Sequence, residues 1–241
     1  MTNFYKDKQQ IIDWLDKYQV KNYTLIPNEK YGFVIDVSGD VDLRSRKLFN
    51  IPVKFNKIIK GFDCSNNNLI SLEFCPKVTG GSFYCYDNQL TSLEFCPQTV
   101  SNNFNCGNNK LTSLEFCPQT VIGGFYCHSN QLTSLEFSPQ KLGGDFYCNN
   151  NKLTSLKFSP KTVGDDFYCS NNELTSLNFC PQAVGGGFYC SYNSKLKEIQ
   201  EITDFKSIYL EHKKILTTKF SDKLKNDLIN DNSKKTAKIK I

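Results

Sequence analysis

The chain has 241 residues, with 29 Lys plus Arg against 24 Asp plus Glu and a formal net charge of +5. Its 39% hydrophobic and 22% charged residues are typical of a folded protein and exclude a highly charged disordered chain. No apolar run is long enough to cross a bilayer, and the charged N-terminus lacks the apolar stretch of a signal peptide. We therefore expect a cytoplasmic protein without a membrane partner.

Residues 1–40 predict an N-terminal cap made of a helix and a β-hairpin. Residues 7–19 place five apolar or aromatic residues on one helical face: Ile11, Ile12, Trp14, Leu15 and Tyr18. Residues 23–27 and 33–37 then predict two strands around a polar turn. We expect this helix and hairpin to seal the end of the repeat region that begins at residue 41.

An internal repeat of 21 residues dominates the middle of the chain. Each unit has Phe, then Cys two residues later, then Asn three residues after that. The phenylalanines are Phe62, Phe83, Phe104, Phe125, Phe146, Phe167 and Phe188. One such unit cannot bury its apolar side chains alone, so neighbouring units must stack. Residues 41–196 therefore predict a β-rich solenoid of about eight coils, the first of them a degenerate coil from Val41 to Val53.

The spacing within a unit predicts the path of one coil. Phe and Cys alternate with an outward residue, as on a short strand with two inward side chains. The Asn amide is expected to bind backbone groups of its own and the adjacent coil, forming a ladder. Leu111, Leu114 and Phe116 should point into the same interior. Pro118 then bends the return leg, and the glycines at 123–124 close the turn.

The repeat resembles the leucine-rich repeat. Ile122-x-x-Phe125-x-Cys127-x-x-Asn130-x-Leu132 matches the LxxLxLxxNxL core of that family, with Phe and Cys in two Leu places. The short return leg is similar to that of small bacterial and phage proteins of the family. The resemblance implies a parallel β-sheet on a concave face and is almost silent on function.

Residues 197–241 are expected to form a C-terminal helical cap with a basic tail. Residues 217–230 place Phe220, Leu224 and Leu228 on one side of an amphipathic helix. The charge is uneven: residues 194–241 hold 12 basic and 7 acidic side chains, whereas residues 62–193 hold 6 and 10. A basic end can favour nucleic acid, but the chain has no nucleic-acid-binding motif, which disfavours that partner.

The outward residue between Phe and Cys forms the most distinctive surface feature. It is Tyr in five units, which predicts an aromatic column for a protein or glycan partner. The alternative is that neighbouring rings stack and only stiffen the sheet. The predicted binding residues are Tyr84, Tyr126, Tyr147, Tyr168 and Tyr189, flanked by Tyr86, His128, Asp145 and Asp166.

The eleven Cys have no CxxC pairing of the kind that binds metals, so we expect buried structural thiols and no metal or cofactor. Ser138 and Ser159 replace the Cys that precedes Pro in other units, which indicates a need for small size. Neither a nucleophilic triad nor a phosphate-binding loop is present. The sequence therefore predicts a non-enzymatic protein-interaction scaffold, with a glycan-binding module as the alternative.

Overall fold

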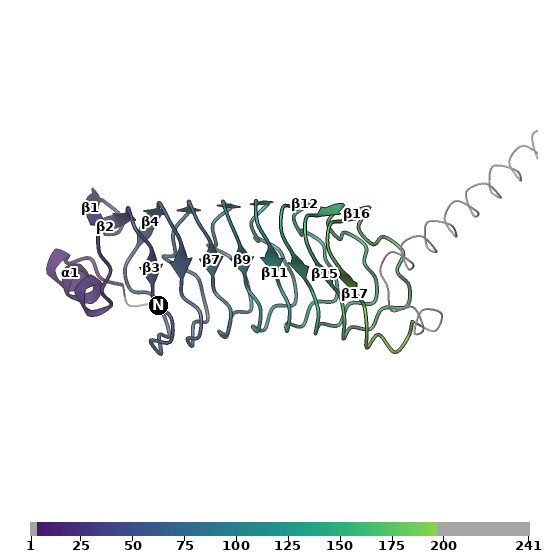
Figure 1. Cartoon of the computed structure of the whole chain (residues 1–241). Helices are drawn as coiled ribbons and strands as arrows, with labels where there is room; N and C mark the ends of the chain where they lie inside the picture. Colours follow the sequence, from purple (N-terminus) through teal and green to yellow (C-terminus); the bar gives the residue numbers. More distant parts are fainter. Residues whose placement is uncertain (1–3, 197–241) are drawn as a thin grey trace, which may run out of the picture. The chain divides into compact units, whose positions relative to one another are not determined.

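The computed structural model describes residues 4–196, which form a β-solenoid with about seven turns of 21 residues and one short helix. Figure 1 shows successive coils following one another from the helix to the last strand. The predicted C-terminal cap, including the helix at 217–230, lies outside the described residues.

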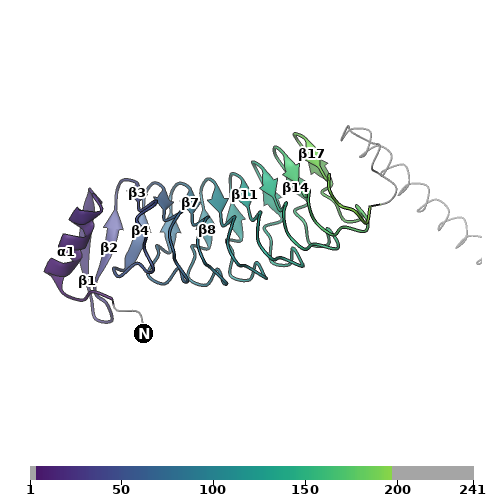
Figure 2. The same cartoon turned by 90° about the horizontal axis from the view of Figure 1, so that it is seen from below.

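One side of every coil contributes a two-residue strand to an eight-stranded sheet. Neighbours pair in parallel without a slip of register, with Val41 opposite Phe62 in the first pair and Phe opposite Phe in the others, as the constant spacing predicts. Figure 2 shows these strands in succession from β3 to β17. They are β3 (Val41–Asp42), β5 (Phe62–Asp63), β7 (Phe83–Tyr84), β9 (Phe104–Asn105), β11 (Phe125–Tyr126), β13 (Phe146–Tyr147), β15 (Phe167–Tyr168) and β17 (Phe188–Tyr189).

The return legs form further short strands. The six-stranded sheet runs in the order β1-β2-β4-β6-β8-β10 and the three-stranded sheet in the order β12-β14-β16. Of each pair of residues in β8, β10 and β12, the first is exposed and the second is buried, so these legs add a second row to the core. Their bounds are β4 (Phe55–Ile58), β6 (Val78–Thr79), β8 (Thr99–Val100), β10 (Thr120–Val121), β12 (Lys141–Leu142), β14 (Thr162–Val163) and β16 (Ala183–Val184).

One helix and two antiparallel strands precede the coils. Helix α1 (Lys8–Lys17) begins after Asp7, whose carboxylate accepts a hydrogen bond from the Gln10 N–H at 3.0 Å. Strands β1 (Tyr23–Asn28) and β2 (Gly32–Val37) are antiparallel, and β2 also pairs in parallel with β4. The buried Trp14 of α1 lies 6.3 Å from the Phe55 ring of the first coil.

The core is a stack of phenylalanine rings. Rings of neighbouring coils lie 5.0 to 5.9 Å apart from Phe62 to Phe188. The turns of neighbouring coils also pack closely. A Cβ added to Gly164 would lie only 2.1 Å from the Gly143 carbonyl oxygen. Backbone packs there on backbone, which explains the glycine.

The predicted asparagine ladder is present. The Asn109 amide nitrogen donates to the carbonyl oxygens of Cys106 and Gly107 in its own coil, and to that of Cys85 in the previous coil at 3.0 Å. Its side-chain oxygen accepts from the Leu90 N–H at 2.9 Å. Each buried amide thus binds two coils together, and equivalent contacts recur from Asn67 to Asn193.

The expectation that Phe116 points inward is wrong. Its side chain is 49% exposed, whereas the following Cys117 is fully buried. The Cys117 N–H donates to the Leu114 carbonyl at 3.0 Å, which closes a β-turn, and Phe116 lies in this turn with a φ of +66°. The turn breaks the alternation of inward and outward residues, so Cys takes the inner place and Phe faces out.

The cysteines that precede Pro have a second role beside small size. Cys117 donates from Sγ to the Phe137 carbonyl oxygen at 3.1 Å, and Ser138 donates from Oγ to that of Phe158 at 2.7 Å. The position therefore needs a small hydrogen-bond donor, which both residue types supply. All eleven cysteines are free, nine of them buried, and burial raises the pKa of the Cys117 thiol to about 12.

Candidate functional site

We call the five predicted tyrosines the tyrosine column: Tyr84, Tyr126, Tyr147, Tyr168 and Tyr189. The last four form a continuous row. The ring centroids of Tyr126 and Tyr147 lie 5.0 Å apart, those of Tyr147 and Tyr168 4.3 Å, and those of Tyr168 and Tyr189 4.1 Å. Parallel pairing of β11, β13, β15 and β17 places them there. Tyr84 stands apart, because the intervening strand β9 carries Asn105.

The two predicted aspartates also serve the backbone. Asp145 accepts from the Asp166 N–H at 3.0 Å, and Asp166 in turn accepts from the Gly187 N–H at 2.6 Å. The second oxygen of Asp145 accepts from the Tyr126 hydroxyl at 2.8 Å. Burial, this hydrogen bond and the nearby carboxylate all raise the pKa of Tyr126. Asp145 therefore orients one tyrosine and links two coils.

Tyr86 and His128 lie in the row beside the tyrosine column. The Tyr86 ring is 6.3 Å from that of Tyr84. A Cβ on Gly107 would lie 2.5 Å from Nε2 of His128, so the imidazole occupies the space that this glycine leaves. Burial lowers the pKa of His128, with Asp87 acting in the opposite direction. His128 is therefore a half-buried ring whose charged form is disfavoured by burial.

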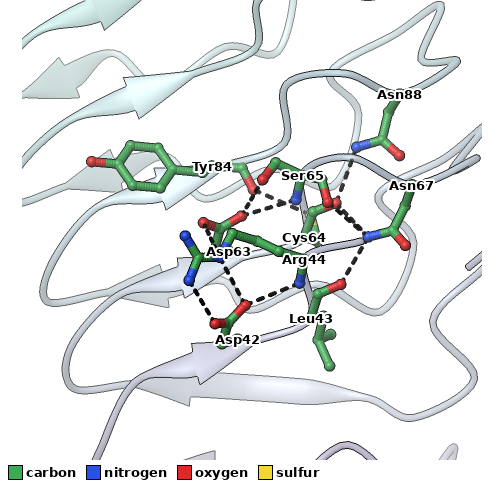
Figure 3. Close-up of polar contacts among 9 residues, drawn as sticks. All are labelled: Asp42, Leu43, Arg44, Asp63, Cys64, Ser65, Asn67, Tyr84 and Asn88. Carbon is green, nitrogen blue, oxygen red and sulfur yellow. Dashed lines mark hydrogen bonds and ion pairs between the residues drawn. The ribbon is translucent and has the colours of Figure 1, made fainter. Parts of the chain in front are cut away.

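A polar cluster lies at the N-terminal end of the same sheet (Figure 3). Arg44 donates to both carboxylate oxygens of Asp42, at 3.0 and 2.8 Å, and its Nε lies 3.4 Å from the Asp63 carboxylate. Asp63 also accepts from the Ser65 hydroxyl at 2.6 Å. The Arg44 hydrogen bond lowers the pKa of Asp42, whereas burial raises that of Asp63.

The cluster borders a hollow of about 460 Å³. Its polar and aromatic lining also includes Asp40, Lys60, Ser82, Tyr84 and Asn102, with Gly61 and Gly81 beside them. Sequence reasoning missed Arg44 and the hollow, although Asp42 and Asp63 stand at the outward position of their strands. The Asp-x-Arg and Asp-x-Ser spacing was an available signal, because Asp binds the backbone two residues on.

Within residues 4–196, no three His, Cys, Asp or Glu side chains come together as a metal ion would need. In the same part of the chain, no helix has the length and apolar character to cross a membrane. Searches against family models, curated proteins and solved structures found no match to this chain. Function must therefore be argued from the surface chemistry of the solenoid.

Proposed function

We propose that this chain is a non-enzymatic scaffold of the leucine-rich repeat type that binds a protein partner through the tyrosine column. The repeat assignment rests on the 21-residue coil, the parallel strand at Phe-x-Cys and the asparagine ladder that follows it. A cytoplasmic setting in a bacterium or phage belongs to the same proposal.

The single observation that carries the binding role is a difference in residue type between coils at the outward position, which lies between Phe and Cys in the regular coils. Where this position is Asp42, Asp63 or Asn105, its side-chain oxygen accepts a hydrogen bond from the backbone N–H two residues later, at 2.9 to 3.0 Å. A tyrosine cannot make this contact, because its only polar atom lies at the far end of the ring. Five coils thus exchange a turn-stabilising residue for a large aromatic one.

Ring stacking alone does not account for that exchange. An aromatic pair contributes about 0.5–1.5 kcal/mol beyond its buried area, and the lost hydrogen bond is worth about the same. What tyrosine adds is a rigid, partly exposed ring with a hydroxyl at its edge, and Tyr189 is 43% exposed. Tyrosine is enriched at protein interfaces for this combination of contact area and low entropy cost.

The test is affinity capture of a partner from an extract of the source organism. The variant Tyr126→Ala, Tyr147→Ala, Tyr168→Ala should recover far less partner than the wild type. A matched control, Thr112→Ala, Thr133→Ala, Thr154→Ala, changes three exposed residues at the same spacing and should recover as much. Equal recovery by the tyrosine variant would remove the column as the binding face.

The hollow supports a second candidate function, glycan binding. Carboxylates and an arginine beside Tyr84 offer hydrogen bonds and a ring face of the kind that sugars use. A glycan array should then give hits for the wild type that Tyr84→Ala loses, and an array without hits excludes this candidate. A nucleic-acid partner is disfavoured, because the three aspartates of the hollow outnumber its two cations, Arg44 and Lys60.

A further inference from the structure

The solenoid carries a second aromatic row, which we call the phenylalanine column. Its members stand in the turn after the second Leu of each coil, and 42% to 64% of each side chain is exposed. Such a contiguous row of large apolar side chains is unusual on a soluble surface and marks interaction sites. The members are Phe95, Phe116, Phe137, Phe158 and Phe179.

Local geometry argues against Phe in this place. All five residues have φ between +66° and +71°, each inside a β-turn closed by the N–H of the next residue. A turn with positive φ at this position normally holds Gly or Asn, and a bulky residue there is strained. The ring is therefore kept neither for the turn nor for the buried core. Strain of this kind points to a function for the side chain.

The first regular coil shows what can cover such a ring. Phe74 occupies the same position with a φ of +71° but is only 4% exposed. The rings of Phe4 and Tyr31 lie 5.1 and 5.8 Å from it. Two aromatic side chains from another segment therefore dock on this member. The column continues that interface along the solenoid.

Charge specifies what else the occupant carries. The residue before Phe is an exposed glutamate in three adjacent coils, Glu94, Glu115 and Glu136. In the next coil it is Lys157, whose ammonium lies over the Phe158 ring at 4.8 Å from the centroid. The Phe158 ring thus accepts a cation on its face. Where glutamate replaces lysine, the ring and carboxylate together offer a place to a cation from outside.

We propose that the phenylalanine column, with Glu94, Glu115 and Glu136, binds a basic protein segment that brings aromatic side chains together with Lys or Arg. Phe95 stands 11 residues after Tyr84 in a coil of 21 residues, beyond the turn at Asn88. The two columns therefore occupy different sides of the coil. This surface is independent of the tyrosine column.

The test is fluorescence anisotropy of the full chain with three labelled peptides that repeat Lys-Phe-Ser, Glu-Phe-Ser or Lys-Ala-Ser. The Lys-Phe-Ser peptide should bind, and the other two should bind at least about tenfold more weakly. A triple variant should also bind the Lys-Phe-Ser peptide at least about tenfold more weakly than the wild type. Its changes are Phe95→Gly, Phe116→Gly and Phe137→Gly. The control Tyr126→Ala, Tyr147→Ala, Tyr168→Ala should bind it as the wild type does.

A second variant keeps the rings and reverses only the charge. Glu94→Lys, Glu115→Lys, Glu136→Lys should abolish binding of the Lys-Phe-Ser peptide, so the test does not depend on the folding of the glycine variant. The proposal is overturned if no peptide binds, if the acidic peptide binds equally well, or if the charge-reversal variant binds like the wild type. Loss of binding in the tyrosine variant would place the site on the other column.

Discussion

Phe104 and Phe116 belong to the same coil, yet their environments are opposite. The Phe104 ring is fully buried between Phe83 and Phe125, whereas half of the Phe116 side chain faces solvent from a strained turn. Deleting a buried ring costs about 3–5 kcal/mol through lost transfer energy and the cavity it leaves. At Phe116, the loss of a half-buried ring is offset by release of backbone strain of about 1–3 kcal/mol.

We therefore predict that Phe104→Ala lowers the free energy of unfolding by about 3–5 kcal/mol, while Phe116→Gly changes it by no more than about 1 kcal/mol. Urea titration followed by circular dichroism measures both. A large loss from Phe116→Gly would show that the outer ring supports the fold.

Asp63 offers a pH-dependent prediction. Burial raises its pKa, so the folded state binds the proton more tightly than the unfolded chain does. Ionisation of the buried carboxyl therefore destabilises the folded state, and this penalty is largest above the folded pKa. It disappears below the unfolded pKa of about 3.9. An Asn at position 63 would keep an oxygen that accepts from the Ser65 N–H. Asn105 accepts from the Gly107 N–H in the same way two coils later.

We expect Asp63→Asn to be more stable than the wild type at neutral pH and to lose that advantage as the pH falls from neutral to about 4. Thermal melts across that pH range measure the difference. An advantage that is equal at all pH values would mean that ionisation of Asp63 is not the cause.

The residue scale also shows where sequence reasoning ends. The burial of Phe104 follows from alternation along a strand, and the sequence predicts it. The exposure of Phe116 depends on a positive φ, which nothing in its residue type signals, because Phe is normally excluded from such turns. The role of Asp145 was likewise hidden, since its acceptor contact lies with the next coil.

The asparagine ladder is the element that fixes each strand to its turn. Asn109 donates to three carbonyl oxygens and accepts from the Leu90 N–H at a buried position, so its removal leaves that N–H without its partner. The Cys85 and Cys106 carbonyls keep the amides of Asn88 and Asn130 as donors. A buried polar group without a partner costs about 1–3 kcal/mol. The loss therefore exceeds that of an ordinary polar substitution.

We predict that Asn109→Ala lowers the free energy of unfolding by about 1–3 kcal/mol. Gln131→Ala, an exposed position in the next coil, is the matched control and should change it by less than about 0.5 kcal/mol. Chemical denaturation of both variants gives the comparison. If Asn109→Ala lost no more stability than Gln131→Ala, water would replace the amide at little cost.

At this scale the sequence did well, because a period of 21 residues fixes both the strand and its register. The division of the return legs into two sheets could not be read in the same way. Thr99–Val100 and Lys141–Leu142 have similar patterns of exposure but pair in different sheets.

For the described part of the chain as a whole, stability is close to a sum of similar coils and the interfaces between neighbours. This organisation keeps the two surfaces separate, because the tyrosine and phenylalanine columns come from different stretches of each 21-residue unit. Each column can then be lengthened or shortened by changing the number of coils. Its local chemistry stays the same.

Deletion of residues 104–124 tests this organisation. The deletion removes one complete unit and joins Asn103 to Phe125, so every inward column stays in phase. It also removes Asn105, which interrupts the tyrosine column, and brings Tyr84 beside Tyr126. We predict a folded chain with a lower urea m-value, since less surface is exposed on unfolding, and partner binding at least as strong as that of the wild type.

Deletion of residues 104–113 is the control, because it removes half a unit and joins a return leg to Asn103. Phe and Leu would then meet the wrong columns, and cooperative unfolding should be lost. If both deletions unfolded alike, stacking in register would not be what holds the coils together. If the full-unit deletion folded but bound its partner more weakly, Asn105 or Phe116 would belong to the binding site, and the tyrosine column would not act alone.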